Sequence, residues 1–210
     1  MTTARSLTTS DGESLVAEFA LAAGAERAAM VLCHPHPQYG GTMRSIVISA
    51  LFEALPAAGV TCLRFNYRGV AGSTGTHDGG RAERVDALAA VHALVEVVGT
   101  DLPLILTGWS FGADVALSVA DAPIAAWLAI APPLRFATDL APVAGDARPK
   151  HLALAEHDEF RPPHEVADAV AAWTATTTEV VGGASHFFIG RTERLVTIAG
   201  AFVSEVAARR

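Results

Sequence analysis

The chain has 210 residues, 51% of them hydrophobic and 18% charged, and its formal net charge is −7 at pH 7. This apolar content suffices for one substantial core, so a single domain over residues 1–210 is expected. The charged residues form no block of one sign, and nothing in this mildly acidic composition suggests a nucleic-acid-binding surface. With no stretch as long as a membrane span and no apolar N-terminal leader, we expect a cytoplasmic protein without a membrane partner.

Two alternating runs, Ser6–Thr9 and Ser14–Leu21, are joined at Asp11-Gly12, which predicts a β-hairpin. Strand-like and helical segments then alternate. Strands are expected at Ala28–Cys33, Val60–Asn66, Leu102–Thr107, Ala125–Ala131, His151–Glu156 and Thr178–Val181. Helices are expected at Met43–Leu55 (with Thr42 as N-cap), Arg81–Val98, Ala113–Ala120, His164–Ala175 and Arg191–Ala208. This alternation predicts an α/β fold, a mostly parallel sheet with helices on both faces.

The run Gly108-Trp-Ser-Phe-Gly112 is a G-x-S-x-G pattern between an expected strand and an expected helix. In this setting a serine hydroxyl is exposed on a tight turn above a sheet. The turn leaves no room for a side chain at either glycine. The pattern therefore predicts that Ser110 is a nucleophile.

A serine hydroxyl needs a general base, and the base needs a group that orients it. His186 lies in the loop after the last expected strand, and Asp158 follows the strand before it. The order Ser110, Asp158, His186 is the chain order of α/β-hydrolases. Glu156, still within its strand, and Asp139, after the preceding strand, are the alternative acids.

Acyl transfer also needs two backbone N–H donors for the developing oxyanion. Phe111, directly after the predicted nucleophile, is expected to supply one. The loop after Ala28–Cys33 reads His34-Pro-His-Pro-Gln-Tyr-Gly-Gly-Thr42, and its prolines have no N–H. His36, between the prolines, is the candidate for the second donor. The alternative is that this loop is only a rigid turn.

Four aromatic residues flank these positions and are expected to line an apolar acyl pocket, namely Tyr39, Trp109, Phe160 and Phe187. Larger hydrolases often insert a cap between the two strands that here end near Ala131 and begin near His151. Only Pro132–Lys150 is available, and its four prolines argue against a long helical lid. A minimal cap predicts a preference for short acyl chains.

On these motifs the chain resembles the α/β-hydrolase superfamily. In particular, it is similar to the small, lidless, esterase-like branch with H-P-H-P after one strand and N-x-R-G, here Asn66-Tyr-Arg-Gly69, after the next. The likeness covers nearly the whole chain. It implies an eight-strand sheet, no cofactor, and a triad of Ser110, Asp158 and His186. His34-Pro35 departs from the His-Gly of many members.

Two further patterns are interpreted as structural. The glycines of Gly69-x-x-Gly72-x-x-Gly75 do not open the next helix, because the polar stretch Thr76–Gly80 intervenes, so no dinucleotide is expected. His34 and His36 lack the neighbouring acid and histidine that would complete a ligand set, so no metal is expected.

Two pairs of residues are also expected to be structural. Arg68 and Asp86 would tie the glycine-rich loop to the helix below it. Cys33 and Cys62 both lie in apolar runs and are interpreted as buried thiols in a reducing compartment.

Together these observations predict a serine hydrolase that cleaves a carboxylic ester or thioester of a small-molecule acyl substrate through an acyl-enzyme intermediate. An acyltransferase, or an amide or peptide hydrolase, would use the same triad. A non-catalytic binding protein that keeps the fold is the alternative from a different class.

Overall fold

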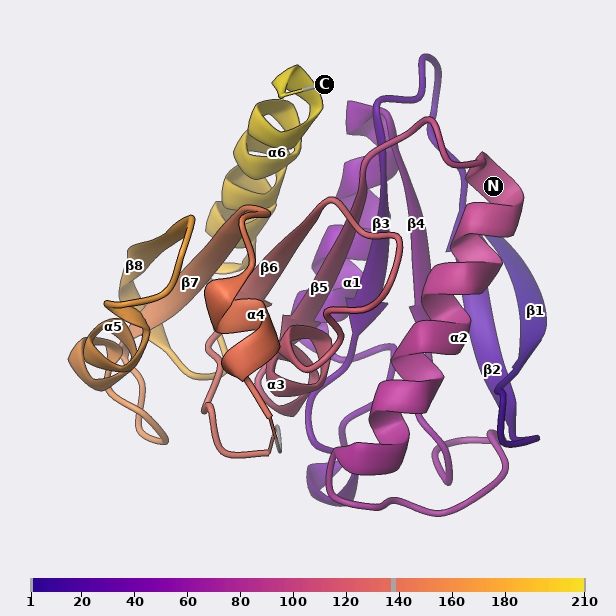
Figure 1. Ribbon diagram of the computed structural model, residues 1–210, viewed down its shortest axis with the longest axis horizontal. Coiled ribbons are helices and arrows are strands. Elements are labelled where there is room, and N and C mark those ends of the chain that lie inside the picture. Colours follow the sequence, from indigo (N-terminus) through magenta and orange to yellow (C-terminus); the bar gives the residue numbers. More distant parts are fainter. Residues whose placement is uncertain (1, 137–138, 210) are drawn as a thin grey trace.

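The computed structural model describes residues 2–136 and 139–209, which form an eight-stranded sheet with helices on both faces (Figure 1). The strands are β1 (Thr2–Thr8), β2 (Ser14–Ala20), β3 (Ala28–Cys33), β4 (Val60–Phe65), β5 (Leu104–Trp109), β6 (Ala126–Ile130), β7 (Lys150–His157) and β8 (Thr176–Ser185). Their order across the sheet is β1-β2-β4-β3-β5-β6-β7-β8. β2 is antiparallel to β1 and β4, and the remaining pairs are parallel. The predicted fold class is confirmed.

The helices divide between the two faces of the sheet. They are α1 (Ile46–Ala54), α2 (Arg81–Val98), α3 (Phe111–Leu117), α4 (Ala141–Gly145), α5 (Pro163–Val170) and α6 (Thr192–Ala208), with short 3₁₀ segments at Pro37–Tyr39 and Leu55–Ala58. α1 and α6 cover one face, and α2, α3 and α5 cover the other (Figure 1). Strand side chains alternate between the faces, so the neighbours Val31 and Leu32 of β3 belong to two separate cores.

The structure corrects the predicted start of the first helix. α1 begins at Ile46 with Ser45 as its N-cap residue, so Thr42 is not the N-cap. A turn precedes the helix, in which the Ser45 N–H donates to the Thr42 carbonyl at 2.9 Å. The N–H of Met43 donates to Asn66 Oδ1 at 2.9 Å. These contacts hold the backbone in a turn, and the helix begins only after it.

The last strand is longer than predicted. β8 runs to Ser185, past the predicted end at Val181, and Gly182 and Gly183 lie within it. Gly183 has φ +67°, a conformation that glycine adopts without strain, and the pairing register shifts at this point. Beyond the shift, Ser185 pairs with His157 of β7. The glycine pair is thus an irregularity inside the strand rather than the start of a loop.

The segment between β6 and β7 contains no long lid in the part that the structure describes; residues 137 and 138 of this segment lie outside that part. Its helix, α4, has five residues.

α5 ends at Val170, before the predicted end at Ala175, because the Trp173 N–H donates to the Val170 carbonyl. The N–H of Thr174 donates to the Ala144 carbonyl at 2.9 Å, which ties this end of α5 to α4.

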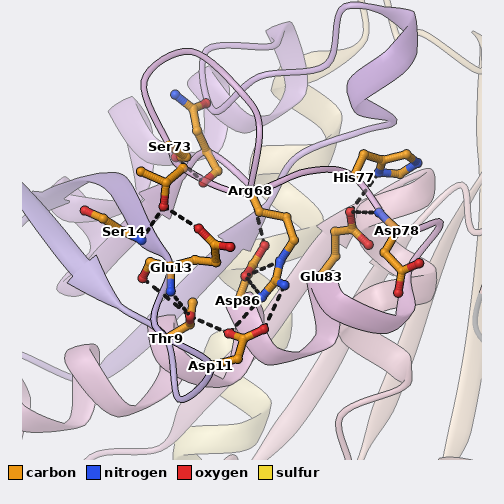
Figure 2. A network of polar contacts seen from close by, with 12 residues as sticks. Thr9, Asp11, Glu13, Ser14, Arg68, Ser73, His77, Asp78, Glu83 and Asp86 are labelled. Carbon is orange, nitrogen blue, oxygen red and sulfur yellow. Dashed lines mark hydrogen bonds and ion pairs between the residues drawn. The ribbon is translucent and has the colours of Figure 1, made fainter.

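A polar network anchors the loop after β4 (Figure 2). The Arg68 guanidinium donates to Asp86 Oδ1 from Nε at 3.0 Å and from Nη2 at 2.7 Å, and to Asp11 in the hairpin turn at 2.8 Å. The Arg68 backbone N–H also donates to Asp86 at 2.9 Å. The expected Arg68–Asp86 pair is confirmed, and it fastens hairpin, loop and α2 together. Cys33 and Cys62 are, as expected, buried free thiols.

Candidate active site

Ser110 occupies the tight turn between β5 and α3. Its backbone has φ +54° and ψ −123°, a conformation that costs energy for any residue other than glycine and is common at functional sites. The sheet holds this turn, since the Ser110 N–H donates to the Ile130 carbonyl of β6 at 2.8 Å. α3 starts directly after the turn, at Phe111, and ends at Leu117, so the predicted helix Ala113–Ala120 is shifted toward the N-terminus.

The two glycines of the turn have no space for a side chain. A Cβ on Gly108 would lie 2.0 Å from the carbonyl oxygen of Gly112, and one on Gly112 would lie 2.3 Å from that of Cys33. These distances are far below van der Waals contact. The steric interpretation of the G-x-S-x-G pattern is therefore confirmed.

Asp158 and His186 meet because their strands are neighbours. His157 at the end of β7 pairs with Ser185 at the end of β8, so the residues that follow each strand leave the sheet side by side. This is a direct consequence of parallel pairing, in which the carboxyl ends of neighbouring strands lie at the same edge.

A continuous chain of hydrogen bonds joins three of the predicted residues. His186 Nε2 lies 2.8 Å from Ser110 Oγ, and His186 Nδ1 lies 2.8 Å from Asp158 Oδ2. The other Asp158 oxygen accepts the N–H groups of Phe160 and Arg161 at 2.9 and 3.1 Å. Burial works to raise the pKa of Asp158, but the hydrogen bond and charge of His186 and the two N–H donors outweigh it and lower the pKa. Asp158 is thus an ionised group suited to orient an imidazole.

The backbone and ring of His186 are held as well. The Trp109 indole N–H donates to the His186 carbonyl at 3.1 Å, and the His186 N–H donates to Glu159 Oε2 at 3.1 Å. The Phe160 ring lies 4.6 Å from the imidazole, centroid to centroid. These contacts fix the imidazole that Ser110 meets.

The two alternative acids lie elsewhere. Glu156 Oε2 accepts the N–H of Gly183 at 2.6 Å, and Asp139 Oδ1 accepts the N–H of Ala141 at the start of α4 at 3.0 Å. Neither carboxylate is hydrogen-bonded to His186.

The loop after β3 and the nucleophile turn line one cleft, to which they contribute His36 and Ser110. No acceptor is found within the described residues for the backbone N–H of His36 or of Phe111. A Cβ on Gly41 would lie 2.1 Å from the Pro35 carbonyl oxygen, so the loop closes tightly on itself. The Gly41 N–H donates to the His36 carbonyl at 3.1 Å. These contacts fix the backbone of the loop and thereby the position of His36.

His34 is a structural residue of this loop. Its Nε2 lies 3.1 Å from the backbone N–H of Tyr67, and its Nδ1 lies 2.7 Å from the Pro35 carbonyl oxygen. Burial lowers the pKa of His34 to about 3, so the ring is neutral, with Nδ1 as donor and Nε2 as acceptor. With both nitrogens engaged in this way, His34 is unsuited to share a metal ion with His36.

The cleft above Ser110 has a volume of about 520 Å³ and an aromatic, largely apolar wall. All four residues that the sequence predicted for a pocket line it: Tyr39, Trp109, Phe160 and Phe187. Other residues that the sequence did not indicate for the pocket also line it, among them Ile46, Pro133, Arg135 and Phe136. Tyr39, Phe160 and Phe187 are exposed and form part of its rim. A volume of this size is typical of small-molecule sites.

Asp114 in the first turn of α3 shapes one wall of the cleft. Its buried carboxylate accepts the backbone N–H groups of Leu134, Arg135 and Phe136 at 2.8, 2.7 and 2.9 Å. Leu134 itself has φ +52°, so the segment is bent sharply around this carboxylate. One signal in the sequence was an acidic residue inside the otherwise apolar run Ala113–Leu117.

Among the residues that the structure describes, no group of three or more His, Cys, Asp or Glu side chains is arranged to hold a metal ion. No helix in that part of the chain is both long and apolar enough to cross a membrane.

The comparisons with known proteins agree with this fold. An α/β serine hydrolase homologue from Coxiella burnetii is 31% identical, with 95% of this chain and 96% of that chain covered and a TM-score of 0.81. The chain belongs to the α/β-hydrolase superfamily. The resemblance in the sequence is thereby confirmed at the level of this superfamily, and the activity class of the chain is hydrolysis.

A second solved structure supports the membership in the α/β-hydrolase superfamily. A serine hydrolase without a lid from Xanthomonas campestris is 28% identical, with 99% of this chain and 94% of that chain covered and a TM-score of 0.82. An uncharacterized protein of Rickettsia prowazekii is 33% identical over 175 residues, which are 79% of this chain and 73% of that protein. No protein-family model matches the chain.

Proposed function

We propose that this α/β-hydrolase is a serine hydrolase that cleaves a carboxylic ester or thioester of a small molecule through an acyl-enzyme intermediate. The observation that carries the proposal is the hydrogen-bonded chain from Ser110 through His186 to Asp158, with both outer distances at 2.8 Å. A serine hydroxyl hydrogen-bonded to an imidazole that a carboxylate orients is the arrangement that makes it a nucleophile.

In the first half-reaction, Ser110 Oγ attacks the carbonyl carbon while His186 Nε2 accepts the hydroxyl proton. The backbone N–H groups of Phe111 and His36 stabilise the oxyanion. The tetrahedral intermediate collapses as His186 gives the proton to the leaving alcohol or thiol. Asp158 stays ionised and stabilises the imidazolium. In the second half-reaction, water attacks the acyl-enzyme carbonyl while His186 accepts its proton, and His186 then returns the proton to Ser110 Oγ as the acid leaves. No cofactor is required.

A panel of acyl esters, thioesters and amides assayed with purified protein tests this function. Ser110→Ala and His186→Ala are each expected to remove nearly all acyl turnover, and the double variant should be little worse than either, because triad members act as a unit. Asp158→Asn should cause a large loss, whereas the matched carboxylate changes Glu156→Gln and Asp139→Asn should not. Retention of most activity by Ser110→Ala would overturn the mechanism.

The same panel separates hydrolysis from acyl transfer. Added alcohol or amine acceptors compete with water for the acyl-enzyme, and an acyltransferase would form the transfer product in preference to the free acid. If wild-type protein turned over amides but neither ester class, the substrate class proposed here would be wrong and the triad chemistry would remain.

A further inference from the structure

Among the described residues that line the cleft, one, Arg135, has a permanently charged side chain, and the rest of the wall is largely apolar. Arg135 lines the same cleft as Ser110, and within the described residues no carboxylate lines it. The side chain is exposed, and its guanidinium carbon lies 5.0 Å from the centre of the Phe136 ring. A guanidinium in this position faces the space that a substrate would fill.

The Arg135 guanidinium has no hydrogen-bond acceptor among residues 2–136 and 139–209, a condition it shares with Arg5 alone of the described arginines. The others donate to carboxylates, carbonyls or hydroxyls, as Arg161 does to the Pro133 carbonyl at 2.7 Å. The chain carries a net charge of −7, so an approaching anion is repelled by the molecule as a whole. The Arg135 guanidinium gives the cleft a local positive charge, opposite in sign to the net charge of the molecule.

The backbone beneath this cation is fixed. Asp114 accepts the N–H groups on both sides of the Arg135 Cα, that of Arg135 at 2.7 Å and that of Phe136 at 2.9 Å. The Asp114 carboxylate is buried and hydrogen-bonded to these backbone donors, while the guanidinium charge acts on it through space without a hydrogen bond. The backbone of Arg135 is therefore fixed, and the N–H groups of its guanidinium are available to a ligand.

The position of Arg135 indicates which part of a substrate would reach it. A leaving group must face His186, from which it takes its proton, and the rings of Phe160 and Phe187 lie 4.6 and 5.7 Å from that imidazole. Arg135 lies instead beside the loop that carries His36. The portion of the substrate that extends toward Arg135 is thus the acyl portion.

We propose that the cleft selects esters or thioesters whose acyl portion carries a carboxylate or similar anion remote from the scissile carbonyl, and that Arg135 binds this anion. The inference rests on the proposed function and names its substrate class. A guanidinium presents paired N–H donors that match a carboxylate, and charge-assisted bonds of this kind are the stronger ones. The aromatic walls hold the methylene chain in between.

The proposal is tested with the 4-nitrophenyl monoesters of succinic, glutaric and adipic acids. Each is compared with the neutral diester in which the remote carboxylate is methylated and the 4-nitrophenyl ester is kept. Each pair has the same reacting carbonyl and chain length and differs in the remote charge. We expect Arg135→Gln to lower kcat/KM for the best anionic ester about tenfold, the order expected for losing one charge-assisted contact, while the neutral ester changes less than twofold. The preference should also shrink from 50 to 500 mM salt, since the site is exposed.

Arg5→Gln is the control variant. It also removes one positive charge and an equivalent contact with an aromatic ring, because the Arg5 guanidinium carbon lies 5.0 Å from the centre of the Phe19 ring. Arg5, however, is remote from the cleft. Arg135→Lys keeps the charge and should retain part of the preference. Equal losses for charged and neutral esters in Arg135→Gln, or an equal effect of Arg5→Gln, would overturn the inference while leaving the ester hydrolase intact.

A binding measurement does not depend on turnover. Titration of monomethyl glutarate or monomethyl adipate into Ser110→Ala, followed by calorimetry, should give a Kd that rises about tenfold when Arg135→Gln is added and stays constant when Arg5→Gln is added. Unchanged affinity in the Arg135 variant would contradict the anion site even if every ester were turned over. If the wild-type protein turned over none of the esters, the proposed function would be contradicted instead.

Discussion

The carboxylate of Asp114 accepts the backbone N–H of Arg135 at 2.7 Å and thereby joins the helix behind Ser110 to the wall of the cleft. Two neighbouring N–H groups bind the same carboxylate. Asp114, four residues after Ser110, thus organises a segment that lies 20 to 22 residues further along the chain.

Removal of this carboxylate should loosen the cleft wall. Asp114→Ala leaves three buried or half-buried N–H groups without their acceptor, a loss of about 1–3 kcal/mol. For a chain of this size we expect Tm to fall by about 3–10 °C, with KM for esters raised more than kcat is lowered. Differential scanning calorimetry and steady-state kinetics measure both effects. Asp139→Ala, which removes an exposed helix-capping carboxylate, is the control, and an equal Tm loss in both variants would refute this role.

The oxyanion role of His36 belongs to its backbone. His36→Ala keeps the N–H and should leave most of kcat, whereas His36→Pro removes it and should cost on the order of 100-fold. The backbone φ of His36 is −55°, close to the value that proline requires, so the substitution is compatible with the loop. Equal losses in the two variants, at unchanged Tm, would assign the effect to the side chain instead.

Buried His34 should make stability depend on pH. Its pKa is lowered by burial to about 3 in the folded state, against 6.5 in the unfolded chain. Between these values the unfolded state binds more protons, so this contribution is complete above pH 6.5 and is lost as pH falls toward 3. The free energy of unfolding should drop less steeply in His34→Gln, by up to about 1.4 kcal/mol per pH unit.

Urea unfolding at pH 7, 6, 5 and 4.5 measures this difference. His92→Gln, which changes an exposed histidine on α2, should follow the slope of the wild type. Parallel curves for wild type and His34→Gln would mean that His34 takes up its proton without unfolding.

The open cleft should limit the benefit of long acyl chains. Each methylene contributes up to ~0.8 kcal/mol only where it is fully buried, and the rim residues Tyr39 and Phe187 are themselves exposed. We expect kcat/KM for neutral 4-nitrophenyl esters to be highest for short chains and to fall or flatten beyond about six carbons, given the size of the cleft. A steady rise through twelve carbons would require an apolar groove beyond the rim.

Local motifs explain why much of the site was predictable. The G-x-S-x-G turn is dictated by contacts among its own residues, and strand ends could be located closely enough to place Asp158 and His186 at one edge of the sheet. Predictions were wrong where tertiary hydrogen bonds override local pattern, as at Thr42, where Asn66 and Ser45 hold a turn ahead of the helix.

The wall formed by Arg135 and Phe136 lies in an irregular segment without hydrophobic periodicity. Its position depends on Asp114, a residue distant in sequence, and no spacing rule connects the two. The sequence therefore predicted that the cleft would be aromatic but did not indicate its cation.

The central claim is that Ser110 is an activated nucleophile, and its covalent labelling tests this most directly. Native protein treated with a fluorophosphonate should gain the mass of one phosphonyl group, and peptide mapping should locate it on Ser110, with no labelling in Ser110→Ala and strongly slowed labelling in His186→Ala. An unlabelled native protein, or a label on any other residue at the same rate in Ser110→Ala, would contradict the account.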